Sequence, residues 1–170
     1  ARRGATVTLV AGPVSLPTPA GVTRVDVENA REMHDVVLRY ADVQNICVLA
    51  AAVADFTPAV PAEQKIKKHT LGDAGMTLSL TPTADILAEL GRNKAGMLLI
   101  GFALETGNER ENALRKLREK NADMIVLNNP LVEGAGFGGD TNVATLLSAD
   151  DRVEELDRMG KAQLADIILD

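Results

Sequence analysis

The sequence alternates between apolar runs of strand-forming residues and segments with helical periodicity, and this alternation restricts the possible folds most. Strands are predicted at residues 5–10, 23–27, 45–51, 76–80, 97–102 and 124–127. Several of these runs are apolar at every position, which is typical of strands that helices cover on both faces. The pattern predicts a single α/β domain over residues 1–170, with a Rossmann-like three-layer α/β/α architecture and a mainly parallel sheet.

Two of the three predicted central helices begin with the same start signal. Asn29 precedes Glu32 by three residues, and Asn108 precedes Glu111 by the same spacing, as in a capping box. Each signal leads into an apolar stripe with helical spacing. The stripes consist of Met33, Val36, Val37 and Tyr40 in the first helix, and of Ala113, Leu114 and Leu117 in the other.

A further helix is predicted between these two. Thr81 is expected to cap it, Pro82 to occupy its first position, and Gly91 to close it. The backbone amides of residues 83 and 84 would then be free at a helix N-terminus, where they can donate hydrogen bonds to an anion.

The two ends of the chain differ from this alternating pattern. Residues 142–156 predict an antiparallel hairpin around Asp150 and Asp151, followed by a C-terminal helix at about 159–169. The opening residues "ARRG" are typical of the last turn of a helix, with Gly4 as its cap. We therefore expect the chain to be a fragment that lacks at least one upstream strand and helix.

Composition excludes several classes of protein. A net charge of -6 and a pI of about 5.0 disfavour a general nucleic-acid binder. Apolar runs all fall short of a membrane span, and no signal peptide is visible. Cys47, the single cysteine, lies in an apolar run and is interpreted as an inert thiol rather than a nucleophile. A cytoplasmic location fits these features.

Most familiar catalytic and cofactor motifs are missing or misplaced. Residues 134–139, "GAGFGG", match the dinucleotide fingerprint in letters, but a β-like run follows them where that motif requires a helix. A flexible loop is the favoured interpretation. There is no P-loop and no serine-hydrolase elbow. His34 and His69 lack partners at zinc-ligand spacing, so no zinc site is predicted.

A local cluster of positive charge stands out in this acidic chain. Lys65, Lys67 and Lys68 lie within four positions, shortly after the apolar strand at 45–51. In open α/β sheets, ligands bind beyond the carboxyl ends of the strands. Converging lysines there would bind a polyphosphate, whereas scattered ones would only be solvated. The pattern by itself leaves both interpretations open.

Other residues suited to a nucleotide site are expected at the same rim of the sheet. Asp55 follows the strand at 45–51, and Phe102 ends the strand at 97–102 with an apolar surface for a base or sugar. Lys116 and Lys120 lie one helical turn apart and flank the buried stripe of their helix. We expect their ammonium groups to extend along the edge of the sheet.

Four stretches together reveal a family resemblance: "ARRGATVTLVAGPVSLPTP", "AAAVADF" followed by "KIKK", "GFALET" and "LRKLREKNAD". Over essentially all 170 residues, the chain resembles the bacterial phosphopantothenoylcysteine synthetases, the synthetase half of the bifunctional coenzyme A biosynthesis protein. The pairing of "AAVAD" with "KIKK" is the most specific of these features.

The resemblance implies a two-step ligase. CTP, with Mg²⁺, would activate the carboxylate of 4′-phosphopantothenate as an acyl-cytidylate, and the amine of L-cysteine would then displace CMP. Carried over by position, the resemblance makes Lys65 the catalytic residue at the reacting phosphates, and Lys67 and Lys68 part of a closing strap. It leaves the metal ligands unassigned. The implied nucleotide-binding residues are Leu49, Ala50, Ala51, Asp55, Lys65, Thr81, Pro82, Thr83, Ala84, Phe102, Lys116 and Lys120.

The chain also departs from the family pattern. It lacks the upstream glycine-rich loop, the asparagine that engages the acyl-cytidylate, and the decarboxylase domain, which alone would use FMN. It has Thr83 and Ala84 where many relatives have Asn-Pro. We therefore expect the fragment itself to be inactive. The resemblance also implies that the intact protein is a homodimer. The alternatives are a non-catalytic binding or dimerisation domain and an NAD(P)-binding reductase-like domain.

Overall fold

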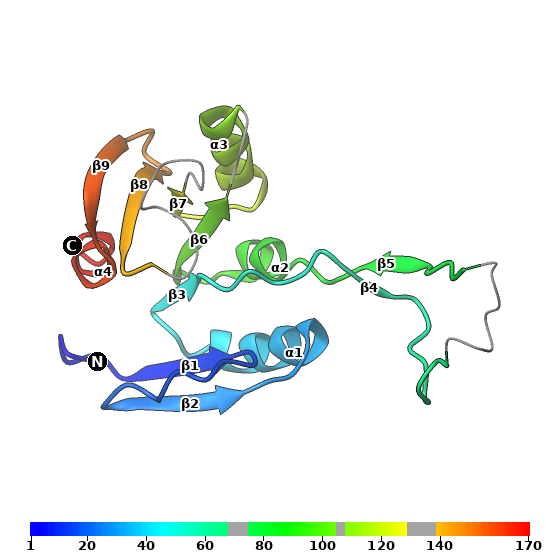
Figure 1. Ribbon diagram of the computed structural model, residues 1–170. Coiled ribbons are helices and arrows are strands. Elements are labelled where there is room, and N and C mark those ends of the chain that lie inside the picture. Colours follow the sequence, from blue (N-terminus) through cyan, green and yellow to red (C-terminus); the bar gives the residue numbers. More distant parts are fainter. Residues whose placement is uncertain (68–74, 105–107, 129–138) are drawn as a thin grey trace. The chain divides into compact units, whose positions relative to one another are not determined.

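The structure is a computed structural model that describes residues 1–67, 75–104, 108–128 and 139–170. It divides into two compact units (Figure 1). Unit 1 comprises Ala1–Asp35 and Ala52–Asp85, and unit 2 comprises Val36–Ala51 and Ile86–Asp170. The boundary between them falls within helix α1 (Ala30–Ala41).

Unit 1 contains two small sheets. Strands β1 (Val7–Ala11) and β2 (Val22–Asp26) pair in parallel, with Val7 opposite Val22. Strands β4 (Phe56–Pro58) and β5 (Leu80–Pro82) pair antiparallel. The predicted strand at 76–80 is therefore wrong in its position, because only its last residue belongs to β5.

Unit 2 is built on a five-stranded sheet with the order β3-β6-β7-β8-β9. Strands β3, β6 and β7 are parallel, whereas β8 and β9 form the predicted antiparallel hairpin. Their bounds are Ile46–Leu49 for β3, Leu98–Leu104 for β6, Met124–Asn128 for β7, Thr141–Ser148 for β8 and Val153–Gly160 for β9.

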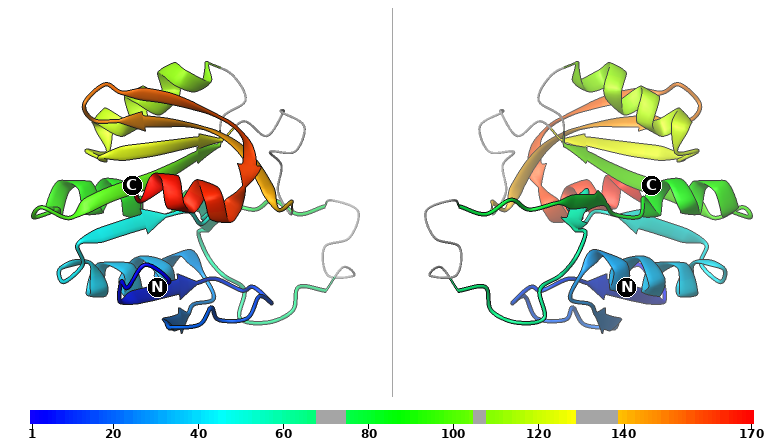
Figure 2. Two further views of the ribbon diagram at one scale, coloured as in Figure 1. Left: turned by 90° about the vertical axis from the view of Figure 1, so that its left-hand side faces the viewer. Right: turned by 90° about the vertical axis from the view of Figure 1, so that its right-hand side faces the viewer.

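Helices cover both faces of this sheet. Helices α2 (Ile86–Asn93) and α3 (Glu109–Glu119) pack on β6, β7 and β8 on one face. Helix α4 (Lys161–Ile168) packs on the other face. It lies in front of the strands in the left view of Figure 2 and behind them in the right view. The α4 face encloses a core of Ile100, Val126, Ala144, Leu146 and Leu164, with Phe102 packed against it. The predicted fold class, α/β with a mainly parallel sheet and an antiparallel hairpin, is confirmed.

Two of the three predicted helix start signals directly precede a helix, and one does not. At α1, the Asn29 Oδ1 accepts a hydrogen bond from the Glu32 amide at 2.9 Å, and the Glu32 carboxylate accepts one from the Glu28 amide at 2.8 Å. Asn108 does precede α3, but its backbone is left-handed and its side chain makes no capping bond. Thr81 and Pro82 lie in strand β5, so the predicted start of α2 is wrong.

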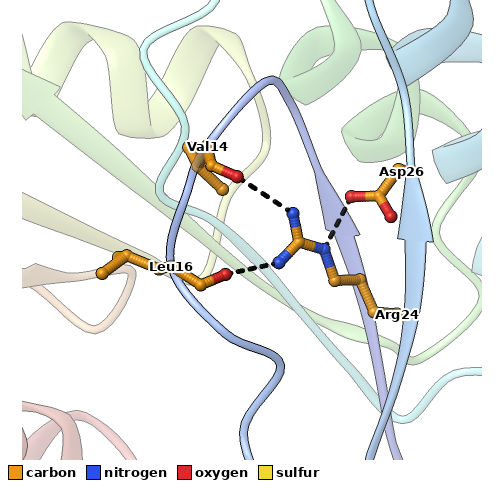
Figure 3. A network of polar contacts seen from close by, with 4 residues as sticks. All are labelled: Val14, Leu16, Arg24 and Asp26. Carbon is orange, nitrogen blue, oxygen red and sulfur yellow. Dashed lines mark hydrogen bonds and ion pairs between the residues drawn. The ribbon is translucent and has the colours of Figure 1, made fainter.

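Arg24 on β2 holds the loop that follows β1 (Figure 3). Its guanidinium donates to the carbonyl oxygens of Leu16 at 2.7 Å and Val14 at 3.4 Å, and pairs with Asp26 at 2.6 Å. Only 16% of the Arg24 side chain is exposed. Because the planar guanidinium presents several donors in a fixed geometry, it can bind the loop and the carboxylate together.

Removal of this guanidinium is expected to loosen the loop without unfolding the protein. In Arg24→Gln we expect elastase to cleave after Val14 several times faster, because two loop carbonyls lose a charged donor. Arg39→Gln, at an exposed position on α1, is the matched control and should cleave at the wild-type rate. Equal rates in both variants would show that Arg24 does not restrain the loop.

Candidate functional site

The carboxyl ends of the parallel strands in unit 2 bring several predicted site residues together. Leu49 pairs with Gly101, which directly precedes Phe102 on β6, and Ala50 and Ala51 continue from β3. The Lys116 ammonium donates to the Phe102 carbonyl oxygen at 3.3 Å. The Lys116 charge therefore lies beside the backbone of Phe102, whose side chain packs on the α4 face of the sheet.

Lys120 occupies a different position from Lys116. It follows the last turn of α3, where its amide donates to the Lys116 carbonyl oxygen at 3.0 Å. This is the end of α3 nearest the amino end of β7, whereas ligands in such sheets bind at the carboxyl ends. The backbone position of Lys120 does not show where its ammonium group lies, and the nucleotide-binding role of Lys120 stays a prediction.

In unit 1, two motif segments far apart in sequence are joined by hydrogen bonds. The Thr83 amide donates to the Asp55 carbonyl oxygen at 2.9 Å, and the Thr83 hydroxyl donates to the Ala54 carbonyl oxygen at 2.7 Å. The segments "AAVAD" and "TPTA" therefore meet. The prediction of a free Thr83 amide at a helix N-terminus is wrong, because that amide is occupied and α2 begins three residues later.

The remaining predicted residues of unit 1 carry exposed charges. Asp55, Lys65 and Lys67 are all exposed to solvent. Lys68 lies outside the described residues, so the predicted strap is described only in part. An exposed lysine keeps its flexible stem and can reach a phosphate that binds nearby. The role of Lys65 at the reacting phosphates stays a prediction.

Sequence reasoning missed a pair of asparagines at the end of β7. Asn128 is the last residue of β7, and Asn142 lies at the start of β8. The Asn142 Nδ2 donates to the Asn128 Oδ1 at 3.1 Å. The available signal was a polar residue at the end of one apolar run, "MIVLN", and at the start of the next, "NVATLL".

A pre-formed metal site is not seen in the part of the chain that the structure describes. No group of three or more histidine, cysteine, aspartate or glutamate side chains gathers there to hold an ion. Magnesium often binds through one or two carboxylates and the phosphates of a nucleotide. A single carboxylate such as Asp55 therefore fits an ion that arrives on the nucleotide.

The "GAGFGG" segment receives no support as a dinucleotide turn. Residues 134–138 lie outside the described residues, but the elements on either side are β7 and β8, which pair antiparallel. The fingerprint requires a helix directly after its glycines. Strand β8 begins at Thr141 instead, as the β-like sequence predicted.

Cys47 has the environment of a structural thiol. It is half-buried on β3, and burial raises its pKa because the thiolate would lose solvation. The neutral thiol is favoured in the folded state. This contribution to stability is present below the pKa of the unfolded chain and is lost as pH rises through the folded pKa.

We expect Cys47 to react slowly with thiol reagents. At pH 7.5, a disulfide reagent should modify the folded protein at least about tenfold more slowly than the urea-unfolded chain, because the thiolate is the nucleophile. The rate of modification is measured by the change in absorbance, in a stopped-flow or a conventional spectrophotometer. Equal rates in the two states would contradict the interpretation of Cys47 as an inert thiol.

A search of the described residues for membrane-spanning helices gave none of sufficient length and apolar character.

Comparison with known sequences gives a match over the whole chain. Residues 1–170 match the family model for the DNA/pantothenate metabolism flavoprotein C-terminal domain. The bifunctional coenzyme A biosynthesis protein CoaBC of Bacillus subtilis is 44% identical over 167 residues, 98% of this chain and 40% of the relative. A cysteine/cysteine sulfinic acid decarboxylase from an unknown prokaryote is 45% identical over 171 residues, 99% of this chain and 47% of the relative. The chain therefore spans less than half the length of these relatives.

Comparison of structures agrees with the sequence match. The crystal structure of the C-terminal domain of CoaBC superposes with a TM-score of 0.81 at 38% identity, covering 99% of this chain and 73% of that one. The full-length family match, the identities and this superposition agree with the resemblance first seen in four short motifs. The chain belongs to the DNA/pantothenate metabolism flavoprotein C-terminal domain family, which includes the phosphopantothenoylcysteine synthetase part of CoaBC.

Proposed function

We propose that this chain is the synthetase part of a coenzyme A biosynthesis enzyme that joins 4′-phosphopantothenate to L-cysteine at the expense of CTP. The products are 4′-phosphopantothenoylcysteine, CMP and pyrophosphate. The observation that carries this proposal is the family match over residues 1–170, at 44% identity to CoaBC of Bacillus subtilis. The placement of the motif residues in each unit adds support.

The first step makes the carboxylate of 4′-phosphopantothenate reactive. A carboxylate oxygen attacks the α-phosphorus of CTP, the bond to the β-phosphate oxygen breaks, and pyrophosphate leaves. Negative charge accumulates on the phosphates in the transition state, so a positioned ammonium group lowers the barrier. The resemblance assigns Lys65 to the reacting phosphates and Lys116 to the binding of the nucleotide. A magnesium ion bound to the nucleotide would neutralise part of the charge on the departing pyrophosphate.

The second step forms the amide bond. The neutral amine of cysteine attacks the acyl carbon of the acyl-cytidylate, and the tetrahedral intermediate expels CMP by cleavage of the C–O bond. The amine loses a proton to solvent or buffer. Lys67 and Lys68 belong to a strap that closes over the intermediate and limits its hydrolysis.

We propose that residues 1–170 alone are inactive. We also propose that they belong to a single synthetase domain in which a further strand pairs with β3. Among the described residues, β3 has one hydrogen-bonded neighbour, β6. Ile46 and Val48 on β3 are 44% and 46% exposed. Parallel strands are normally covered, and an exposed apolar edge strand is a template for pairing.

The intact protein is further proposed to be a cytoplasmic homodimer. The exposed side chains of β9 include Glu154, Glu155, Asp157 and Arg158, and charges of this kind oppose edge-to-edge pairing. The segment around β4 and β5 instead exposes Phe56, Val60 and Leu80, at 57%, 83% and 53%. These exposed apolar side chains support a contact between subunits at this segment rather than at the β8–β9 hairpin. Light scattering of the intact protein should give the mass of a dimer, and a monomer would contradict the proposal.

The reaction is tested by omitting one substrate at a time. The intact protein should release pyrophosphate from CTP only when 4′-phosphopantothenate is present, and it should form the amide only when cysteine is added. Replacement of CTP by ATP tests the nucleotide preference in the same assay. Absence of substrate-dependent release from a folded intact protein would contradict the proposal and favour a non-catalytic binding domain.

A further inference from the structure

We propose that Asn142 is a positioning residue that orients the Asn128 amide so that its nitrogen donates a hydrogen bond to an oxygen of the bound nucleotide. This inference rests on the proposed function. It concerns two residues of unit 2 that the motif comparison did not assign.

Asn142 is an unusual residue for its position. It is 8% exposed, and it is the only buried polar side chain among the described residues. Burial of an amide is unfavourable unless its hydrogen bonds are made. The Asn142 Oδ1 accepts from the Val143 amide at 2.9 Å, and its Nδ2 donates to the Asn128 Oδ1 at 3.1 Å. An apolar side chain would pack here without this requirement, so the amide has a role beyond filling space.

The strand geometry places this pair at the carboxyl end of the parallel strands. Asn128 ends β7 and pairs with Leu104, the last residue of β6. Asn142 precedes the β7–β8 pairing, which extends only to Ala144 opposite Asn128. The register between β8 and β9 also shifts between Asn142 and Ala144. Such irregularities re-aim side chains and are common next to active sites.

The pair lies close to the Phe102 part of the candidate site. Val126, two residues before Asn128, pairs with Phe102. Because alternate residues of a strand share a face, Asn128 lies on the same face of the sheet as Val126 and Phe102. The Lys116 ammonium meets the Phe102 carbonyl oxygen on the adjacent strand. A nucleotide held at Phe102 and Lys116 is therefore one strand away from Asn128.

The hydrogen bond from Asn142 determines which group Asn128 can offer. Its Oδ1 is occupied by the Asn142 donor, while its Nδ2 makes no hydrogen bond within the described residues. Asn128 is only half-buried, so this nitrogen can meet a ligand. Ribose and pyrimidine oxygens are acceptors, and an amide nitrogen is complementary to them. Without Asn142, the Asn128 amide would rotate and present either group.

Asn142→Asp reverses this orientation with little change in shape. One aspartate oxygen still accepts from the Val143 amide, but the other replaces the donor that faced Asn128. The Asn128 amide is then expected to rotate, donate its nitrogen to the aspartate and present its oxygen to the nucleotide. In the intact protein the KM for CTP should rise about tenfold, the size of one lost hydrogen bond, with kcat within about twofold. The KM for cysteine should not change.

Two further variants separate positioning from stability. Asn128→Ala should raise the KM for CTP by a similar factor, and the double variant should match Asn128→Ala alone, because both changes remove the same interaction. Asn45→Asp adds the same charge at an exposed position before β3 and should leave the KM unchanged. If Asn142→Asp does not fold, Asn142→Leu replaces it, with the same direction expected.

Calorimetric titration with CTP distinguishes the failure of this inference from failure of the proposed function. If the wild-type intact protein does not bind CTP, the proposed function fails, and this inference fails with it. If the wild type binds CTP and the Asn142 and Asn128 variants bind equally well, only the positioning role is overturned. A lower melting temperature for Asn142→Asp with an unchanged KM would likewise assign Asn142 a structural role alone.

Discussion

Lys65→Gln in the intact protein is expected to lower the rate of cysteine-dependent pyrophosphate release from CTP by about 100-fold or more. The expectation follows from the proposed role of its ammonium group at the reacting phosphates, where loss of one positioned donor typically costs this much in rate. Lys65 is exposed in the structure, so its loss should not affect the core. Steady-state release of pyrophosphate measures the effect.

Two lysine controls sharpen this test. Lys161→Gln removes the same charge from an exposed position at the start of α4 and should retain full activity. Lys67→Gln should lower the rate less than Lys65→Gln, because a strap residue contributes to closure rather than to the reacting phosphates. Near-normal release by a folded Lys65→Gln variant would remove Lys65 from the chemistry and favour a binding domain.

Gly91→Ala is expected to destabilise the protein by about 3 kcal/mol or more, although the same change in a helix is usually favourable. A Cβ atom at Gly91 would lie 1.8 Å from the Lys120 carbonyl oxygen and 2.8 Å from its carbon. Backbone atoms cannot rotate away, so α2 must shift from the turn after α3. That shift would also strain the hydrogen bond from the Asn121 Nδ2 to the Gly91 carbonyl oxygen, at 2.7 Å.

Urea unfolding of the two variants measures this effect against a matched control. Gly160→Ala places a methyl group where nothing lies within 4 Å, at a φ of -67° that any residue adopts. Its free energy of unfolding should stay within about 0.5 kcal/mol of the wild type. A Gly91→Ala protein as stable as this control would show that the close approach of α2 and the α3 turn is not required.

Local signals predicted those elements whose stabilising contacts lie nearby in sequence. The Asn29 capping box could be predicted because both of its partners lie within four residues. The apolar runs of β6 and β7 were recognised because strands buried on both faces are apolar throughout. The hairpin of β8 and β9 followed from the apolar run of β8, the Asp150–Asp151 turn and the alternating segment after it.

The errors occurred where contacts between distant residues decide the structure. Thr81 and Pro82 have the composition of a helix start, but Phe56–Pro58 pairs with them as a strand, and no local pattern specifies that pairing. Proline is tolerated there because such a short ribbon has free edges. Thr83 similarly bonds to Ala54 and Asp55, almost thirty residues earlier, so its amide could not be recognised as occupied.

The candidate site could be predicted in part. Phe102 and Lys116 were predicted at the same rim of the sheet, and the Lys116 ammonium donates to the Phe102 backbone carbonyl oxygen. Their roles in nucleotide binding stay predictions. Asn128 and Asn142 were missed because single asparagines in β-runs carry no motif, and their pairing depends on the register of β7 with β8. Residue types therefore suggested the chemistry, whereas strand register determined which side chains meet.

Transfer of an oxygen label tests the central claim most directly. If 4′-phosphopantothenate carries ¹⁸O in its carboxylate, attack on the α-phosphorus of CTP places that oxygen between the acyl group and the cytidylyl phosphate. After cysteine cleaves the C–O bond, mass spectrometry of the intact protein's reaction should find one ¹⁸O atom in CMP. Label in inorganic phosphate together with CDP, or no label in CMP while the amide forms, would contradict the acyl-cytidylate.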